Sequence, residues 1–367
     1  MNKRSALARR IVEEINEIAR AIGREVRIMD ICGTHEDTIN RGGIREILPR
    51  NIHLFAGPGC PVCITPVEDI AAMMKIAEQK DMIVTTFGDM YRIPTPRGSF
   101  SDFRARGYDV RVVYSIYDAY RLALKNDRLV VHFSPGFETT TAPTAGILSE
   151  VVERKIENFR IYSVHRLTPP AVEYLLKEGT RIDALITPGH VSAIIGVRGW
   201  RYLTENYGIP QVISGFDPLD VLLSILMLLK MIQEGRKDIE NEYSRVVEED
   251  GNIEAQEKIE RFFTVRDAKW RALGIIPKSG LYLRDEYQWL DIRSEIDAPA
   301  MELPDLEAGC RCGEILRGLA LPDECPLFGR VCTPSTPVGP CMVSSEGTCS
   351  VFYKYRKRGM GAMENGG

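Results

Sequence analysis

The sequence predicts an α/β protein with two duplicated parallel-sheet units and a central cleft, followed by a region that is helical and then loop-rich. Short β-rich runs alternate with helical patterns from Val26 onward, and the same order recurs about 100 residues later. Such alternation is typical of a parallel sheet covered by helices. The 367 residues, 44% of them hydrophobic, exceed the usual size of one core, so more than one domain is expected.

Residues 1–25 are expected to form a helix that packs on the core. Ser5 can cap its start, Gly23 can end it, and Ile11, Ile15 and Ile18 recur on one helical face.

The two α/β domains are expected at residues 26–126 and 127–232. The first has predicted strands at 26–31, 52–56, 82–86 and 110–114 and helices at 67–79 and 117–125. The second has predicted strands at 129–133, 160–164, 184–186 and 211–213 and helices at 140–153, 170–178 and 219–231. Ordered echoes such as Glu36 with Glu138 and Gly88 with Gly189 support a duplication.

Residues 233–367 form the third expected region, a helical linker followed by a tail. The composition is charged and helical to about Arg261 and becomes rich in Cys, Pro and Gly from Ala308. The tail has too few periodic apolar residues for an ordinary core, so we expect cysteine chemistry to hold it together.

Charge and hydropathy exclude several classes of function. The net charge of −4 and the even scatter of charges provide no basic stripe for nucleic acid. The N-terminus lacks a signal-peptide core, and the apolar run Val221–Leu229 is far shorter than the roughly 20 residues that span a membrane. We therefore expect a cytoplasmic protein, whose nine cysteines serve metal or redox chemistry rather than a disulfide framework.

Three cysteines and a histidine follow the first two predicted strands: Cys32, His35, Cys60 and Cys63. Ligands of open parallel sheets bind beyond the carboxyl ends of the strands, which is where these residues fall. A helix starting after Thr34 would favour the Cys32 thiolate, and thiolate with imidazole suits iron, zinc or copper. The spacing of Cys60 and Cys63 also matches a redox dithiol, and spacing alone does not separate a dithiol from a metal clip.

The second unit carries polar residues at the corresponding strand ends: Glu138, Thr139, Thr140, His165 and His190. Hydroxyls and free amides at a helix start suit an anion or another polar ligand. The alternatives are that the threonines only cap the helix and that each histidine is a hydrogen-bonded structural residue.

Six cysteines fall within 40 residues of the tail: Cys310, Cys312, Cys325, Cys332, Cys341 and Cys349. Four of them could hold a [4Fe-4S] cluster and leave two thiols, and a structural zinc site is the rival interpretation. No phosphate loop, dinucleotide fingerprint, nucleophile elbow or H-E-x-x-H helix is present, nor the C-x3-C-x2-C triplet of radical enzymes.

Five motifs in this order resemble the HypD family of [NiFe]-hydrogenase maturation proteins. They are Cys32-Gly33-Thr34-His35, Gly57-Pro58-Gly59-Cys60-Pro61-Val62-Cys63, the stretch 135–143, Ser163-Val164-His165 with Pro169-Pro170, and Cys310-Arg311-Cys312-Gly313. The resemblance runs from about residue 26 into the tail. Asp37 stands where many relatives carry a second histidine.

The resemblance implies a scaffold that assembles the Fe(CN)2CO group in a stable complex with HypC, while HypE delivers cyanide. By motif, Cys32 resembles the cysteine that holds the iron jointly with HypC, His35 its polar neighbour, and Cys60 with Cys63 the facing thiol pair. The tail resembles the family's iron-sulfur domain, with a [4Fe-4S] cluster on Cys310, Cys325, Cys332 and Cys349 and an exchangeable pair formed by Cys312 and Cys341. The family pattern implies a monomer when alone, and the alternative functions are a cluster-fed thiol-disulfide oxidoreductase and a structural zinc protein.

Overall fold

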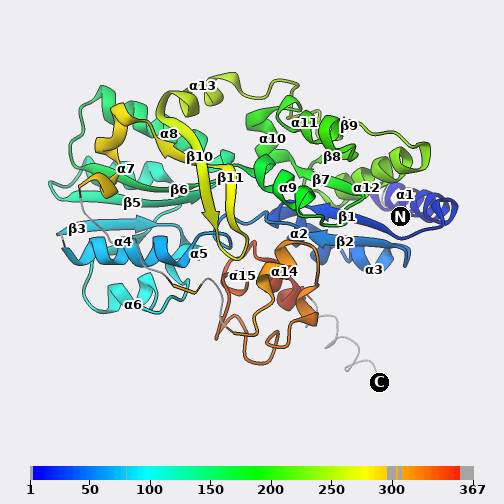
Figure 1. Cartoon of the computed structure of the whole chain (residues 1–367), viewed down its shortest axis with the longest axis horizontal. Coiled ribbons are helices and arrows are strands. Elements are labelled where there is room, and N and C mark those ends of the chain that lie inside the picture. The colour runs from blue at the N-terminus through cyan, green and yellow to red at the C-terminus, as the bar shows by residue number, and fades with distance from the viewer. Residues whose placement is uncertain (1–2, 80, 296–302, 305–307, 356–367) are drawn as a thin grey trace.

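The computed structural model describes residues 3–79, 81–295, 303–304 and 308–355. It is an α/β structure with two parallel sheets, confirming the predicted class (Figure 1). Sheet A has the order β2-β1-β7-β8-β9, with bounds β1 Val26–Asp30, β2 Ile52–Ala56, β7 Ala184–Pro188, β8 Gln211–Ser214 and β9 Ile239–Asn241. Sheet B has the order β4-β3-β5-β6, with bounds β3 Met82–Thr86, β4 Val110–Val112, β5 Leu129–Gly136 and β6 Phe159–His165.

The sequence predicted one sheet formed by residues 26–126 and another formed by residues 127–232. The strands are distributed between the two sheets differently. The chain leaves sheet A through helix α4 (Val67–Gln79), builds all of sheet B, and returns through helix α9 (Thr168–Lys177) to β7 beside β1. Both sheets thus take strands from both ranges, so the division into two consecutive sheets is wrong. Periodicity marks a strand, whereas its neighbour depends on long-range packing.

Alternate residues of the inner strands face different cores, as the two-residue period of a strand requires. In sheet B, Val131 packs in the core that contains helix α4, whereas Val130 packs with helices α7 (Ile116–Ala123) and α8 (Glu138–Glu153). Figure 1 shows α4 and α8 on opposite sides of this sheet. In sheet A, Ile28 packs with helices α1 (Lys3–Ile22) and α12 (Pro218–Glu234), while Met29 faces the other core.

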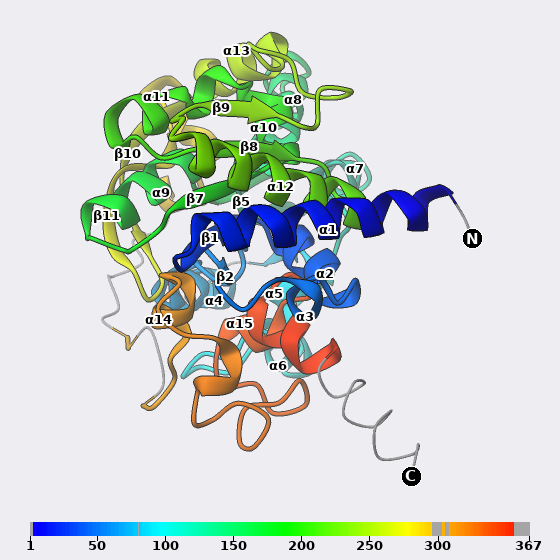
Figure 2. The ribbon, with the colours of Figure 1, turned by 90° about the vertical axis from the view of Figure 1, so that its right-hand side faces the viewer.

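The predicted N-terminal helix is present as α1, and its Ile11, Ile15 and Ile18 are buried. Figure 2 shows α1 lying along α12. The remaining helices of the α/β part are α2 Gly33–Arg41, α3 Ile44–Ile47, α5 Gly88–Tyr91, α6 Phe100–Ala105, α10 Gly189–Ile195, α11 Arg198–Tyr207 and α13 Ile253–Phe262. No helix in the described part of the chain is long and apolar enough to cross a membrane.

The sequence suggested that the segment after residue 232 is helical, but it also contains strands. It adds β9 to the edge of sheet A and forms an antiparallel hairpin of β10 (Phe263–Trp270) and β11 (Gly274–Leu283). The hairpin contacts the end of β6, where Leu167 N–H donates to Ser279 O at 2.8 Å. Two 3-10 turns, η1 Asp285–Leu290 and η2 Ile292–Ser294, follow it.

The described part of the tail is compact and loop-rich. It contains α14 (Cys312–Leu316), η3 (Pro322–Glu324), α15 (Pro340–Val343) and a helical stretch at 348–355, while 296–302, 305–307 and 356–367 of the expected third region lie outside the described residues. Figures 1 and 2 show α14 and α15 beneath the junction of the two sheets, near α2 and α5. The tail therefore lies against the carboxyl ends of strands from both sheets.

Candidate metal and thiol centre

Cys32 follows β1 and is the N-cap residue of α2, in the extended conformation with φ −151°. The glycine-rich loop after β2 packs directly on it, because a Cβ added to Gly59 would lie 2.5 Å from Cys32 N. Gly33 N–H donates to Gly59 O at 3.3 Å. The loops after two adjacent parallel strands thus meet at Cys32, as the sequence predicts for the carboxyl edge of the sheet.

Cys60 and Cys63 form a disulfide in the loop after β2. Cys63 N–H points at Cys60 Sγ, 3.2 Å away, and Ser344 Oγ of the tail lies 3.4 Å from the same sulfur. The described structure therefore holds this pair in its oxidised form.

A small cavity joins the first cysteine group to the tail. Its volume is about 10 Å³, and it is lined by the sulfur residues Cys32, Cys60, Cys63 and Cys341 together with the carboxylates Asp30, Glu36 and Glu346. A cavity of this size holds about one water-sized group. The tail thus packs over the expected central cleft at Cys32, whose side chain remains partly exposed.

Asp30 and His35 form a buried pair behind Cys32. His35 Nδ1 lies 2.8 Å from Asp30 Oδ1, and His35 Nε2 lies 3.3 Å from Ser214 O. Both ring nitrogens therefore face protein oxygens. Sequence reasoning missed Asp30, although a carboxylate at the end of a strand two residues before Cys32 was a usable signal.

The expectation that the helix start would favour the Cys32 thiolate is outweighed by burial. Burial and the negative charge of Asp30 raise the pKa of the Cys32 thiol to about 12, although amides at the start of α2 act in the opposite direction. Burial likewise raises the pKa of Asp30, against the effect of His35. In the metal-free protein the thiol is protonated, so a cation that binds there must displace the proton.

The four expected cluster cysteines are gathered in the tail. Burial, together with repulsion from Cys312, Cys325 and Cys332, raises the pKa of Cys310 to about 12. Cys349 also has a raised pKa, from burial and from repulsion by the other cysteines of the tail. Neighbouring thiolates of this kind resist ionisation unless a metal compensates their charge.

These thiols fit a [4Fe-4S] cluster by their chemistry and burial. Val338 N–H donates to Cys332 Sγ at 3.4 Å, which is the type of amide contact that surrounds cluster sulfurs. Among the described residues no three Cys, His, Asp or Glu converge on one ion.

Cys312 and Cys341 are buried with their sulfurs 2.9 Å apart. The hydrogen bond from Cys341 lowers the pKa of Cys312, with help from the positive charge of Arg271. The same contact raises the pKa of Cys341 well above its usual value. The two sulfurs are thus close enough to exchange, and Cys341 is the member that also faces the Cys32 cavity.

The polar residues expected to line a cleft in the second unit make hydrogen bonds and packing contacts with their neighbours. Glu138 Oε1 accepts from Thr168 N–H at 2.7 Å and Glu138 Oε2 accepts from Thr168 Oγ at 2.8 Å, while burial raises the Glu138 pKa to about 7. A Cβ on Gly136 would meet Thr140 Cβ at 2.4 Å, and Thr139 is half-buried in the same helix start.

The two histidines of this group are in different surroundings. His165 is buried 2.9 Å from Ser134 Oγ, and burial lowers its pKa to about 3. His190 is exposed and stacks on Phe216 at 3.8 Å between ring centroids. Phe216 also contacts the His35 ring at 4.7 Å, so His190 is the member of the group near the Cys32 loop.

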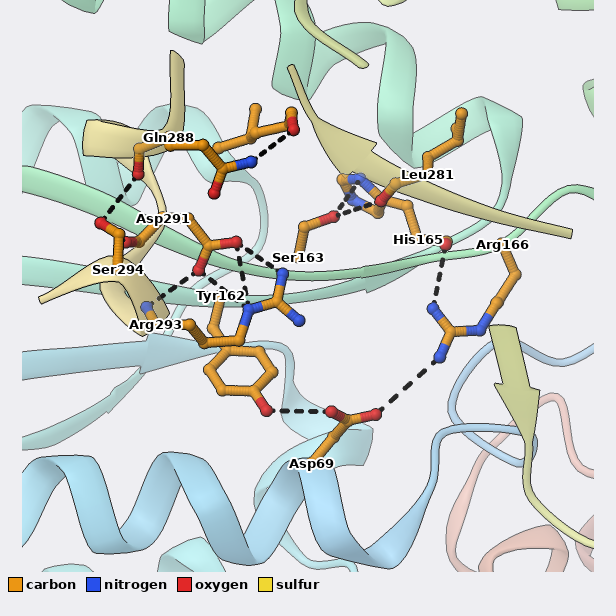
Figure 3. Close-up of polar contacts among 11 residues, drawn as sticks. Asp69, Tyr162, Ser163, His165, Arg166, Leu281, Gln288, Asp291, Arg293 and Ser294 are labelled. Carbon is orange, nitrogen blue, oxygen red and sulfur yellow. Dashed lines mark hydrogen bonds and ion pairs between the residues drawn. The ribbon is translucent and has the colours of Figure 1, made fainter. Parts of the chain in front are cut away.

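A buried ionic network secures the crossover from sheet A to sheet B. Figure 3 shows the Asp69 carboxylate of α4 between Tyr162 and Arg166 of the β6 end, with Tyr162 OH donating to Asp69 Oδ1 at 2.9 Å. Arg166 NH2 lies 3.8 Å from Asp69 and donates to Lys269 O of the hairpin at 2.9 Å. Arg271 N–H in turn donates to Ile64 O at 2.8 Å, directly after Cys63. The hairpin therefore supports the loop that carries the disulfide.

Comparison with known proteins identifies the family. The HypD family model, described as "Hydrogenase formation hypA family", matches residues 6–356. The chain is 44% identical, over 96% of its length and 98% of the relative, to a Methanocaldococcus jannaschii protein named for hydrogenase expression and formation. It is 42% identical to the hydrogenase maturation factor HypD of Cupriavidus necator, covering 95% and 94% of the two chains, and 40% identical to that of Escherichia coli, covering 94% and 93%. The chain belongs to the HypD family of hydrogenase maturation factors.

Proposed function

We propose that this maturation factor, with HypC, scaffolds assembly of the Fe(CN)2CO group of [NiFe] hydrogenases and holds the iron on Cys32. The observation that carries the proposal is the shared cavity, where Cys32, the Cys60–Cys63 disulfide and Cys341 meet. A soft thiolate suits the iron that such a group contains. HypC would supply a further ligand and HypE the cyanide, in the cytoplasm, with this chain a monomer when alone.

The carboxylates around Cys32 suit the arrival of a cation. Asp30, Glu36 and Glu346 line the same cavity and contribute negative charge at short range. Their negative charge attracts a ferrous ion. The same charge disfavours the Cys32 thiolate, so the thiol keeps its proton until the ion displaces it. Arg45 NH2 offsets part of this charge, 2.9 Å from Glu36 Oε2.

The two thiol pairs are the proposed redox residues. The Cys312–Cys341 pair would undergo thiol-disulfide exchange with the Cys60–Cys63 pair. Cys341 lies beside Cys312 and also lines the cavity that Cys60 and Cys63 share. Cys310, Cys325, Cys332 and Cys349 would hold a [4Fe-4S] cluster, which supplies one-electron redox chemistry beside these pairs when bound.

The scaffold proposal is tested by infrared spectroscopy of the complex with HypC, purified anaerobically. Cys32→Ala is expected to abolish the cyanide and carbonyl bands and to retain the visible absorption of the cluster. Asp37→Ala serves as a control in the same helix, and it should retain both signals. Persistence of the bands in the Cys32 variant would rule out its role as the iron ligand.

The cluster assignment has a separate test in the metal content. Cys325→Ser is expected to remove the brown chromophore and about four irons per chain, the content of one cubane. Cys341→Ser should keep both, since that residue is assigned to the exchangeable pair. Zinc in place of iron, in protein purified without oxygen, would favour a structural zinc site.

A second function, a cluster-fed thiol-disulfide oxidoreductase, is favoured by the disulfide beside Cys341. It predicts catalytic reduction of protein disulfides without HypC and without iron on Cys32, whereas the scaffold predicts no turnover. Insulin reduction with dithiothreitol as the electron source distinguishes the two functions.

A further inference from the structure

Ser344 joins the redox disulfide to a carboxylate on another element. Its Oγ lies 3.4 Å from Cys60 Sγ and donates to Asp89 Oδ2 at 3.0 Å. Glu346 N–H donates to Ser344 Oγ at 3.2 Å, so the hydroxyl oxygen is held in place by its own segment. The three groups form a continuous row from sulfur to hydroxyl to carboxylate.

Asp89 connects this row to solvent. Its side chain is 25% exposed, whereas Cys60 is only 4% exposed. Asp89 Oδ2 also accepts from Ser345 N–H and Ser345 Oγ, both at 2.8 Å. The charged groups that interact with the carboxylate include Arg92, whose Nη2 lies 3.8 Å from Asp89 Oδ1, and the Glu346 carboxylate, which Asp89 repels.

We propose that Ser344 and Asp89 form a proton path that serves Cys60 during opening and closing of the Cys60–Cys63 disulfide. This inference rests on the proposed redox role of that pair. A sulfur as buried as that of Cys60 exchanges protons with bulk water slowly, and the Ser344 hydroxyl lies within hydrogen-bond distance of both Cys60 and Asp89.

The step balances with a dithiol as the reductant. One reductant thiolate attacks Cys63 Sγ, the S–S bond breaks, and its electron pair moves to Cys60 Sγ. Cys60 takes a proton from Ser344 Oγ, and Ser344 recovers one from bulk water by way of the partly exposed Asp89 carboxyl group. The second reductant thiol then displaces Cys63, so the reductant ends as a disulfide and both protein cysteines as thiols. In the reverse direction Cys60 S–H donates to Ser344 Oγ, and Ser344 passes its proton to Asp89.

The path is tested by the rates of disulfide exchange in the cluster-containing protein. Dithiothreitol opens the bond, oxidised dithiothreitol closes it, and acid quenching with alkylation and mass spectrometry follows the peptide that contains Cys60 and Cys63. Ser344→Ala and Asp89→Asn are expected to slow both directions by about tenfold or more, while their ratio changes little. Ser344→Thr, which keeps a hydroxyl, should restore most of the rate.

Ser345→Ala is the matched control, since Ser345 donates to the same Asp89 oxygen but has no contact with Cys60 in the structure described. It should retain the rates of the parent protein. The proposal is overturned if Ser344→Ala reacts at the parent rate, if Ser345→Ala is slowed equally, or if only the equilibrium shifts. A parent disulfide that resists dithiothreitol in the folded protein would instead refute the redox role of the pair.

Discussion

Glu346 of the tail lies directly against Gly33 of helix α2. A Cβ added to Gly33 would stand 2.5 Å from both the Cβ and the carbonyl oxygen of Glu346, and Thr34 Oγ lies 3.5 Å from Glu346 Oε1. The missing side chain at Gly33 therefore allows the tail to close over Cys32. Any substitution there must displace main chain, which is costly in a packed interior.

Gly33→Ala is expected to loosen the tail over the cavity. The overlap with the Glu346 main chain leaves the added methyl no space, so a loss of about 1 to 3 kcal/mol in the free energy of unfolding is expected. Alkylation of Cys32 and Cys341 by a small reagent should accelerate, as measured by mass spectrometry. Gly146→Ala in helix α8 is the control, because a Cβ there meets nothing within 4 Å. Equal alkylation rates in the two variants would contradict the role of this contact.

Glu138 should make stability depend on pH. Its folded pKa is about 7 against a usual value of 4.5, so between these values the folded protein binds more protons than the unfolded chain. Stability contributed by this group is therefore full below pH 4.5 and is lost as the pH rises to about 7, by roughly 3 kcal/mol in total. Denaturant unfolding at a series of pH values measures it.

The contribution of Glu138 is isolated by comparison with Glu138→Gln, because His132 and His165, whose pKa values are lowered to about 3, act in the opposite direction. The difference in unfolding free energy between the two proteins should change across pH 4.5 to 7 and be flat above it. A difference that is constant with pH would show that Glu138 is ionised in the folded state.

Asp37 anchors the tail helix and is not expected to bind metal. Its Oδ1 accepts from Lys354 Nζ at 3.1 Å and from Tyr355 OH at 2.9 Å. Asp37→Ala should lower the free energy of unfolding by about 1 kcal/mol at most, because the contacts of Asp37 with Lys354 and Tyr355 are partly exposed. Faster hydrogen exchange at residues 348–355 with unchanged iron content is the expected result. Loss of iron from this variant would indicate a metal role.

The Asp30–His35 pair is expected to be strongly coupled in stability. His35→Ala leaves a carboxyl group with no exposed surface beside a vacant space, for which a loss of about 3 kcal/mol is expected. The double variant with Asp30→Ala should lose less stability than the sum of the two single variants, by about 1 kcal/mol or more in a double-mutant cycle. Urea unfolding of the four proteins measures the coupling. Simple additivity would mean that the contact contributes nothing.

Local patterns were sufficient for most of the secondary structure. The bounds of β2, β3 and α4 agree with the periodicity of their residues. The order of apolar residues along the chain shows whether both faces of a strand or one face of a helix will be buried. The hairpin around Gly274 was missed, because its strands carry the exposed charges of Arg266, Asp267 and Lys278. The contacts of Glu138 and His165 were likewise beyond prediction, because their partners Thr168 and Ser134 are chosen by packing.

The sequence by itself determined the class of the fold, the family and the residue types at each strand end, because these follow from local periodicity and motif spacing. Only the tertiary structure decided that β7 lies beside β1 and that Cys341 and Glu346 close over Cys32. Such neighbours are selected by the burial of whole faces and by the fit of glycines such as Gly33 and Gly59 against distant main chain. These are long-range properties that no stretch of sequence carries alone.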